Sequence, residues 1–204
     1  MEKNYLRKIC ECGILVAMAF ALSLIKIPQI FGGAVTAASM VPLVVASYRN
    51  GTLWGLGSAF VFSVIKLVMG FENFSYVTGI ASILAVLFFD YLLAYTAVGI
   101  AGIFKPSRFD SRGTLTLKAS LGAFIGMLLR YACHVVSGAV VWYDLTKVWE
   151  ASDPTNIVFR YGKWAYSAVY NGTYMLPETV ITVAVSAVLA ASVGKSLISK
   201  KSRT

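Results

Sequence analysis

Several ionisable side chains lie inside long apolar segments of this chain, where a charge is costly to keep. They are Lys66, Asp90, Arg130, His134 and Glu178. A charge at the centre of a membrane helix costs about 2.5–3.5 kcal/mol on insertion scales, so such a residue usually faces a partner or a polar cavity. Two interpretations are open: Asp90 and Arg130 form an ion pair that locks two helices together, or Asp90 faces a binding site for a cation.

The residues around Arg130 favour the binding site. Arg130, His134 and Gly138 recur every four residues and therefore share one face of a helix, with Trp142 near its outer end. An anion beside aromatic faces suits a flat, cationic heterocycle, because the rings supply cation–π attraction and the carboxylate supplies charge pairing. A second stripe with the same four-residue spacing consists of Tyr166, Tyr170, Tyr174 and Glu178.

Asn171 can join this site only if the site is wide or the helix is irregular. An ideal helix places Asn171 about 140° around the axis from Tyr166. Pro177 removes one backbone hydrogen bond and could supply the irregularity. Trp142 and Tyr166 also fit an aromatic belt at a membrane interface, so the binding interpretation rests on their coincidence with the buried charges.

The composition requires a membrane protein. Of 204 residues, 58% are hydrophobic and 13% are charged, with a mean hydropathy of +0.73. Soluble domains carry about 25% charged residues, so an ordinary soluble enzyme, a disordered chain and a nucleic-acid-binding domain are excluded. We expect an all-α membrane protein that forms one polytopic domain over residues 1–204. Its six transmembrane helices are predicted at about 9–27, 34–48, 52–70, 77–104, 115–143 and 164–194.

The distribution of charge predicts the orientation. The chain has 18 basic and 9 acidic residues, and most of the basic ones fall in segments that would share one side with the termini. By the positive-inside rule, both termini are expected in the cytoplasm. The basic excess therefore indicates contact with the lipid bilayer and no nucleic acid. The outer loops at 28–37 and 143–163 are expected to cover the opposite face.

A row of small residues marks the first predicted span. Gly13, Ala17 and Ala21 are spaced four apart and flatten one face of the helix, which lets another backbone approach closely. This face either packs inside the domain or docks a separate membrane subunit.

The motifs exclude several activities. Gly194-Lys195-Ser196 resembles the end of a phosphate-binding loop, but Leu189 stands where its first glycine should be. We therefore expect no ATP hydrolysis on this chain. No catalytic or metal-binding motif is present, so we predict no catalytic residue, no metal and no cofactor.

Two sequence blocks carry a family resemblance. The chain resembles the thiamine-specific substrate-binding (S) components of energy-coupling factor transporters, over nearly its whole length. The most specific blocks are LRYACHVVSGAV at 129–140, followed by Trp142, and WAYSAVYNGTYMLP at 164–177. Some relatives carry Glu at the position of Asp90 and Lys at that of Arg130, and a tryptophan where this chain has Gly33.

The resemblance implies a six-helix protein that binds thiamine on its extracellular side. It also implies a membrane-embedded coupling subunit, docked at the small-residue face of the first helix, and two cytoplasmic ATPase subunits. The pocket residues that carry over are Asp90, Tyr91, Arg130, His134, Trp142, Tyr166 and Asn171. Two alternatives are a different ligand, such as a thiamine precursor or another small vitamin, and a membrane enzyme that uses Asp90 and His134 as an acid–base pair.

Overall fold

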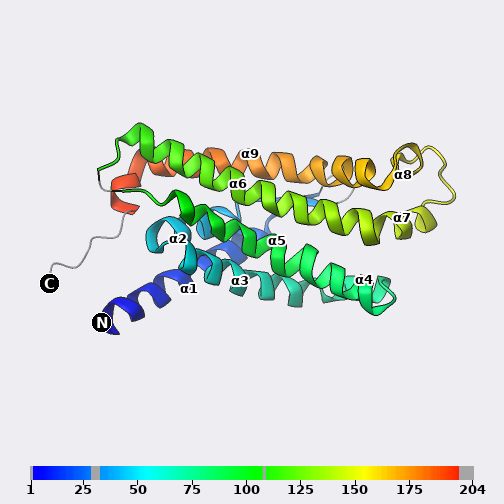
Figure 1. Ribbon diagram of the computed structural model, residues 1–204, viewed down its shortest axis with the longest axis horizontal. Helices are drawn as coiled ribbons and strands as arrows, with labels where there is room; N and C mark the ends of the chain where they lie inside the picture. The colour runs from blue at the N-terminus through cyan, green and yellow to red at the C-terminus, as the bar shows by residue number, and fades with distance from the viewer. Residues whose placement is uncertain (1, 29–32, 108, 198–204) are drawn as a thin grey trace.

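Most of the chain is helical, as expected for a protein whose backbone hydrogen bonds must be satisfied in lipid (Figure 1). The structure is a computed structural model that describes residues 2–28, 33–107 and 109–197. Its α-helices are α1 (Glu2–Leu24), α2 (Val41–Asn50), α3 (Thr52–Met69), α4 (Ile80–Ala85), α5 (Leu93–Thr96), α6 (Arg112–Ser137), α7 (Tyr143–Trp149), α8 (Ile157–Arg160) and α9 (Lys163–Leu197). Two 3₁₀ segments, η1 (Phe71–Tyr76) and η3 (Ala97–Phe104), and two π-helical turns, η2 (Val86–Leu92) and η4 (Gly138–Trp142), complete the helical structure.

Four helical runs in the described residues are long and apolar enough to cross a membrane. They are Thr52–Met69, Ile80–Phe104, Arg112–Trp149 and Lys163–Ser196. These runs correspond to the last four predicted spans, with ends shifted by a few residues, and they support an all-α membrane protein. The beginning of α1 and the end of α9 lie at one end of the molecule, and α4, α7 and α8 lie at the other (Figure 1).

The prediction of a helix over 34–48 is wrong in its first part. Residues Ala34–Thr36 form strand β2, which pairs antiparallel with β1 (Lys26–Pro28), and the following helix α2 begins only at Val41. Residues 29–32 of the predicted outer loop lie outside the described residues. Helix α2 has ten residues and is therefore about 15 Å long, half the thickness of a hydrocarbon core.

The segment predicted as a loop after Tyr143 is partly helical. Helix α6 continues without a break through η4 into α7, so this helical run ends at Trp149 rather than near residue 143. The short helix α8 follows, capped by the side chain of Asn156. The end of the molecule that carries α7 and α8 therefore contains regular structure where an outer loop was predicted.

Small residues bring the central helices together. Helix α6 runs beside α9 (Figure 1) and also packs against η3, which in turn packs against α3. At the contact between α3 and η3, a Cβ added to Gly99 would lie 2.5 Å from the carbonyl carbon of Gly55. A Cβ added to Gly126 on α6 would lie 3.0 Å from the carbonyl oxygen of Val98. Such close backbone packing stabilises helix association where lipid removes the hydrophobic driving force.

We expect Gly99→Ala to destabilise the protein, because the new methyl group meets backbone that cannot rotate away. Overpacking of this kind costs about 1–3 kcal/mol, which lowers the melting temperature by several degrees in a chain of this size. Thermal unfolding of the detergent-purified protein measures the effect. Gly57→Ala on α3 is the matched control, because a Cβ there meets nothing within 4 Å. Equal melting temperatures for the two variants would contradict the close contact.

Candidate ligand-binding site

A cavity of about 830 Å³ opens between the β1–β2 hairpin, α3, η2, α6–η4 and α9. Its volume lies in the upper part of the 300–1,000 Å³ range typical of small-molecule sites. The cavity brings together all of the side chains that the sequence singled out for a pocket. These are Asp90, Tyr91, Arg130, His134, Trp142, Tyr166 and Asn171.

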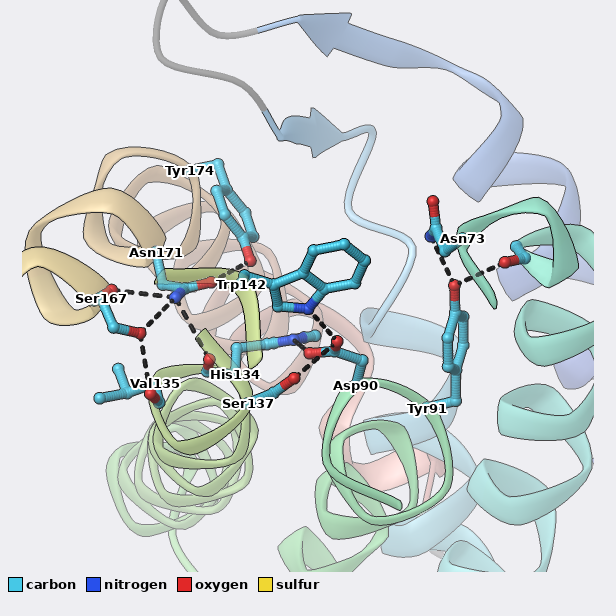
Figure 2. Close-up of polar contacts among 11 residues, drawn as sticks. Asn73, Asp90, Tyr91, His134, Val135, Ser137, Trp142, Ser167, Asn171 and Tyr174 are labelled. Atoms are coloured by element: carbon cyan, nitrogen blue, oxygen red, sulfur yellow. Dashed lines mark hydrogen bonds and ion pairs between the residues drawn. The ribbon is translucent and has the colours of Figure 1, made fainter. Parts of the chain in front are cut away.

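Asp90 is held by three donors from one neighbouring helix (Figure 2). Ser137 Oγ and Trp142 Nε1 both donate to Asp90 Oδ2 at 2.7 Å, and His134 Nδ1 lies 3.2 Å from Oδ1. Three hydrogen bonds fix the orientation of the carboxylate, and such bonds are strong when the acceptor is a carboxylate. The arrangement therefore holds the Asp90 carboxylate at the wall of the cavity, where a ligand can contact it.

Two π-helical turns make this arrangement possible. Asp90 lies in η2 and Trp142 ends η4, and their side chains form one of the three hydrogen bonds. A π turn inserts an extra residue into an α-helix and thereby rotates the residues that follow, and such turns occur frequently at functional sites. With the four-residue spacing of a regular helix, Trp142 would lie on the same face as Arg130 and His134. The π turn η4 changes the direction in which the Trp142 side chain points.

His134 offers a hydrogen-bond acceptor to the cavity. A carboxylate only accepts, so His134 Nδ1 donates to Asp90, and Nε2 is an acceptor when the ring is neutral. His134 Nε2 is buried and has no partner in the described structure. The ring is packed edge-on against Tyr95 and Tyr174, with centroid distances of 6.2 and 6.3 Å. Asp90 and His134 together therefore present acceptors to a ligand that carries N–H donors.

The alternative interpretation, an ion pair between Asp90 and Arg130, is wrong. Arg130 Nη1 lies 2.9 Å from Glu178 Oε2, and both side chains are almost completely buried. The Arg130 guanidinium also lies over the Tyr95 ring, 4.7 Å from its centroid. Thr36 Oγ1 donates to the other oxygen of Glu178 at 2.5 Å, which ties strand β2 to α9. Among the described residues, Asp90 therefore forms no ion pair with a lysine or an arginine.

Tyr91 closes the side of the cavity opposite Asn171. Its hydroxyl accepts from Asn73 Nδ2 at 2.7 Å and donates to the carbonyl oxygen of Gly70 at 3.0 Å (Figure 2). The Tyr91 ring stacks on Phe74 with a centroid distance of 6.0 Å. These contacts fix η1 against η2 and leave the ring as part of the cavity wall.

The side-chain amide of Asn171 is hydrogen-bonded to other residues of the protein. Its Nδ2 group donates to the carbonyl oxygens of His134 and Ser167, and its Oδ1 accepts from the Tyr174 hydroxyl at 2.5 Å (Figure 2). The amide thus joins α9 to α6 directly behind His134. Helix α9 is continuous through Pro177, so Tyr166 and Asn171 line the same cavity because the cavity is wide.

The tyrosine stripe on α9 forms an aromatic wall. The rings of Tyr166 and Tyr170 stack at a centroid distance of 5.8 Å, and Tyr174 packs edge-on against Tyr170. A Cβ added to Gly33 would collide with the Tyr174 ring. Tyr174 therefore fills the space beside Gly33, where some relatives carry a tryptophan.

The sequence did not point to several side chains that contact the residues of the site. Ser137 supplies a donor to Asp90, Tyr95 supports Arg130, and Asn73 orients Tyr91. Ser137 lies three residues after His134, so helical spacing could have placed it on the same face. Nothing in the spacing of Asn73 or Tyr95 indicated their partners.

The small-residue face of α1 is exposed. Gly13, Ala17 and Ala21 are all open to the surroundings, and a Cβ added to Gly13 meets nothing within 4 Å. The buried side of the helix carries Cys12 and Val16 instead. The small-residue face therefore does not serve packing within the described part of the chain.

No cluster of three metal-binding side chains occurs among the described residues.

Comparisons with known proteins agree on one family. Residues 9–198 match the family described as Thiamine transporter protein (Thia_YuaJ). The chain is 30% identical over 210 residues to the thiamine transporter ThiT of Bacillus subtilis strain 168, covering 98% of both chains. The solved structure of ThiT from Listeria monocytogenes is similar in fold, with a TM-score of 0.70 and 21% sequence identity, over 96% of this chain and 100% of that chain.

We expect Glu178→Gln to destabilise the protein strongly, because it leaves the buried Arg130 charge without its counter-charge. Removing one partner of a buried ion pair costs about 3–5 kcal/mol. Thermal unfolding in detergent measures the loss. Glu72→Gln, at an exposed acid with no ion pair in the described structure, is the control. If Glu178→Gln unfolds at the wild-type temperature, the buried pair does not stabilise the fold.

Proposed function

The chain belongs to the thiamine transporter family, and from this premise we propose that it is the thiamine-binding subunit of an energy-coupling factor uptake transporter. The observation that carries the proposal is Asp90, a carboxylate at the wall of a large cavity that has three hydrogen-bond donors and, in the described part of the chain, no lysine or arginine paired with it. A buried anion in this state favours a positively charged ligand.

The geometry matches the chemistry of thiamine at each wall. Asp90 and the free Nε2 of His134 accept from the amino-bearing or cationic part of the ligand. Trp142 and Tyr166 both line the cavity, and the indole ring of Trp142 supplies an aromatic face for stacking and cation–π contact. The Tyr166 ring is almost completely buried against Tyr143 and Tyr170. Asn171 positions His134 by donating to the backbone carbonyl oxygen of His134. It also accepts from the Tyr174 hydroxyl and so helps to orient the edge of the ligand ring. The alternative within this class is a thiamine precursor that keeps the same amino-bearing ring.

The second alternative, a membrane enzyme, no longer applies. The family transports a vitamin and is not a family of enzymes. Within the described site, the proximity of Asp90 and His134 fits ligand binding, because His134 holds the carboxylate in place through Nδ1.

We further propose that residues 1–204 form one domain that crosses the plasma membrane of a bacterial-type cell six times, with both termini in the cytoplasm. The four long helical runs provide four crossings. Helix α1 has 23 residues, enough for a fifth. Helix α2 and the β1–β2 hairpin before it together form the sixth, because ten helical residues alone are too short to cross the membrane.

The partners of the proposed transporter are a membrane-embedded coupling subunit and two cytoplasmic ATPase subunits. The exposed face of Gly13, Ala17 and Ala21 supports docking of the coupling subunit, because small residues permit close helix contact in lipid. ATP is then consumed by the partner subunits, and this chain supplies the ligand specificity.

We expect Asp90→Asn to weaken thiamine binding by about 10- to 100-fold, because the charge-assisted contact to the ligand is lost. Titration calorimetry with the purified protein measures the affinity, and the melting temperature reports whether the fold is kept. Asp144→Asn on α7 is the matched control, since Asp144 is exposed and does not line the cavity. Equal affinities for wild type and Asp90→Asn would refute the site.

We expect the double substitution Gly13→Leu and Ala17→Leu to abolish uptake and spare binding, because both positions lie on the exposed face and far from the cavity lining. Uptake of labelled thiamine by cells gives the first readout, and calorimetry on the purified variant gives the second. Ile14→Leu, on another exposed part of the same helix, is the control. Continued uptake by the double variant would place the docking surface elsewhere.

A further inference from the structure

The end of the molecule that carries the start of α1 and the end of α9 has unpaired positive charge. The turn between η3 and α6 lies at this end as well (Figure 1). Glu11 is paired there with Arg7 and Arg49. Asp110 is paired with Lys118. Other cations at this end form no ion pair within the described part of the chain, namely Lys8, Lys105, Arg112 and Lys195.

The opposite end of the molecule carries charge of both signs. Its exposed acids include Glu72, Asp144 and Asp153, and its exposed cations include Arg160 and Lys163. None of these side chains forms an ion pair within the described residues. An anionic surface is therefore repelled as well as attracted at this end, whereas it meets unpaired cations at the other.

Two exposed apolar side chains lie beside the unpaired cations of the turn. Phe109 in the turn is 98% exposed, and Leu53 in the first turn of α3 is 82% exposed. The Nζ atom of Lys105 would lie 3.9 Å from a Cβ added to Gly51, so the Lys105 ammonium lies at the start of α3. The exposed Arg112 begins α6 at the other end of the turn. We call Leu53, Lys105, Phe109 and Arg112 the terminal patch.

Polar contacts fix the turn that presents Phe109. The Ser107 N–H group donates to Asp110 Oδ2 at 2.7 Å, and Lys118 Nζ donates to the same oxygen at 2.7 Å. Ser111 then caps α6 with its side chain. A phenyl ring held outward in this way is costly in water, and an apolar medium beside the ring removes that cost.

We propose that the terminal patch binds an anionic phospholipid of the leaflet that surrounds this end of the molecule. Lys105 and Arg112 pair with the headgroup phosphate, and Phe109 and Leu53 contact the acyl chains below it. Positive charge beside exposed apolar side chains is the combination that holds a segment at an anionic membrane surface. None of the four residues lines the ligand cavity, so the lipid site is separate from it.

The two cations of the patch suit a phosphate in different ways. Arginine offers a planar fork that matches phosphate oxygens, and lysine offers a compact charge on a flexible stem. Long basic side chains at a membrane surface cover apolar surface with their stems and direct their charged ends to the headgroups. Lys105 and Arg112 can therefore bind one headgroup from the two ends of the turn.

The test is native mass spectrometry of the full-length protein, purified in detergent and mixed with equal amounts of phosphatidylglycerol and phosphatidylcholine that carry the same acyl chains. We expect wild type to retain phosphatidylglycerol in preference. Each cation near an anionic headgroup strengthens binding by about fivefold. Lys105→Met combined with Arg112→Met should therefore lower the affinity for phosphatidylglycerol by about 10- to 30-fold and leave that for phosphatidylcholine unchanged.

The matched control is Arg160→Met combined with Lys163→Met, which removes the same charge from the opposite end of the molecule. The control variant should retain phosphatidylglycerol as wild type does, and the melting temperatures of both variants report whether the fold is kept. Equal retention by wild type and the Lys105 and Arg112 variant overturns the proposal. An equal loss in the control variant overturns it too, because net charge alone would then attract the lipid.

Phe109→Trp tests the apolar contact. The full-length variant is placed in phosphatidylglycerol vesicles with brominated acyl chains, since bromine quenches the emission of a nearby indole. We expect the emission that this substitution adds to that of wild type to be quenched there, and to persist in vesicles without bromine. Emission that is not quenched by the brominated chains overturns the lipid contact, and assigns the exposed ring to a contact with another protein.

Discussion

The structure is organised around one carboxylate, Asp90, which lies partly buried at the wall of the cavity between the helices. Asp90 would be costly there without help, since desolvation disfavours an isolated anion. Ser137 and Trp142 reduce that cost by hydrogen bonding, and His134 completes the shell. Because all three donors come from α6 and η4, the site depends on the packing of these elements against η2 and α9.

A second set of polar contacts, around Arg130 and Glu178, is separate from the contacts around Asp90. Arg130 lies one turn from His134 on the same helix and also lines the cavity. Glu178 holds it by an ion pair at 2.9 Å, and the Tyr95 ring lies against its guanidinium. Thr36 connects the same glutamate to the hairpin that covers the cavity. The separation of the two charge systems leaves Asp90 available to a ligand.

The residue types and their helical spacing predicted the members of the site but not its bonding. Arg130, His134 and Gly138 line the cavity because a four-residue period survives in any α-helix. The contact of Trp142 with Asp90 could not be predicted, because it depends on π turns that leave no recognisable pattern in the sequence. The partner of Arg130 was missed because the choice between two acids is made by the packing of α6 on α9, over a separation of 48 positions.

The long apolar helices were equally predictable, whereas the short elements were not. Apolar length alone marks the four long runs. The β1–β2 hairpin and the ten-residue α2 occupy a stretch whose hydropathy resembles that of a span, and the pairing of Lys26 with Thr36 depends on tertiary contacts.

The most direct measurement of ligand binding at this site is native mass spectrometry of the detergent-purified protein after incubation with thiamine. A cationic ligand bound at Asp90 predicts a single added mass equal to one thiamine per chain, and a chain that remains free of ligand at saturating thiamine would contradict it.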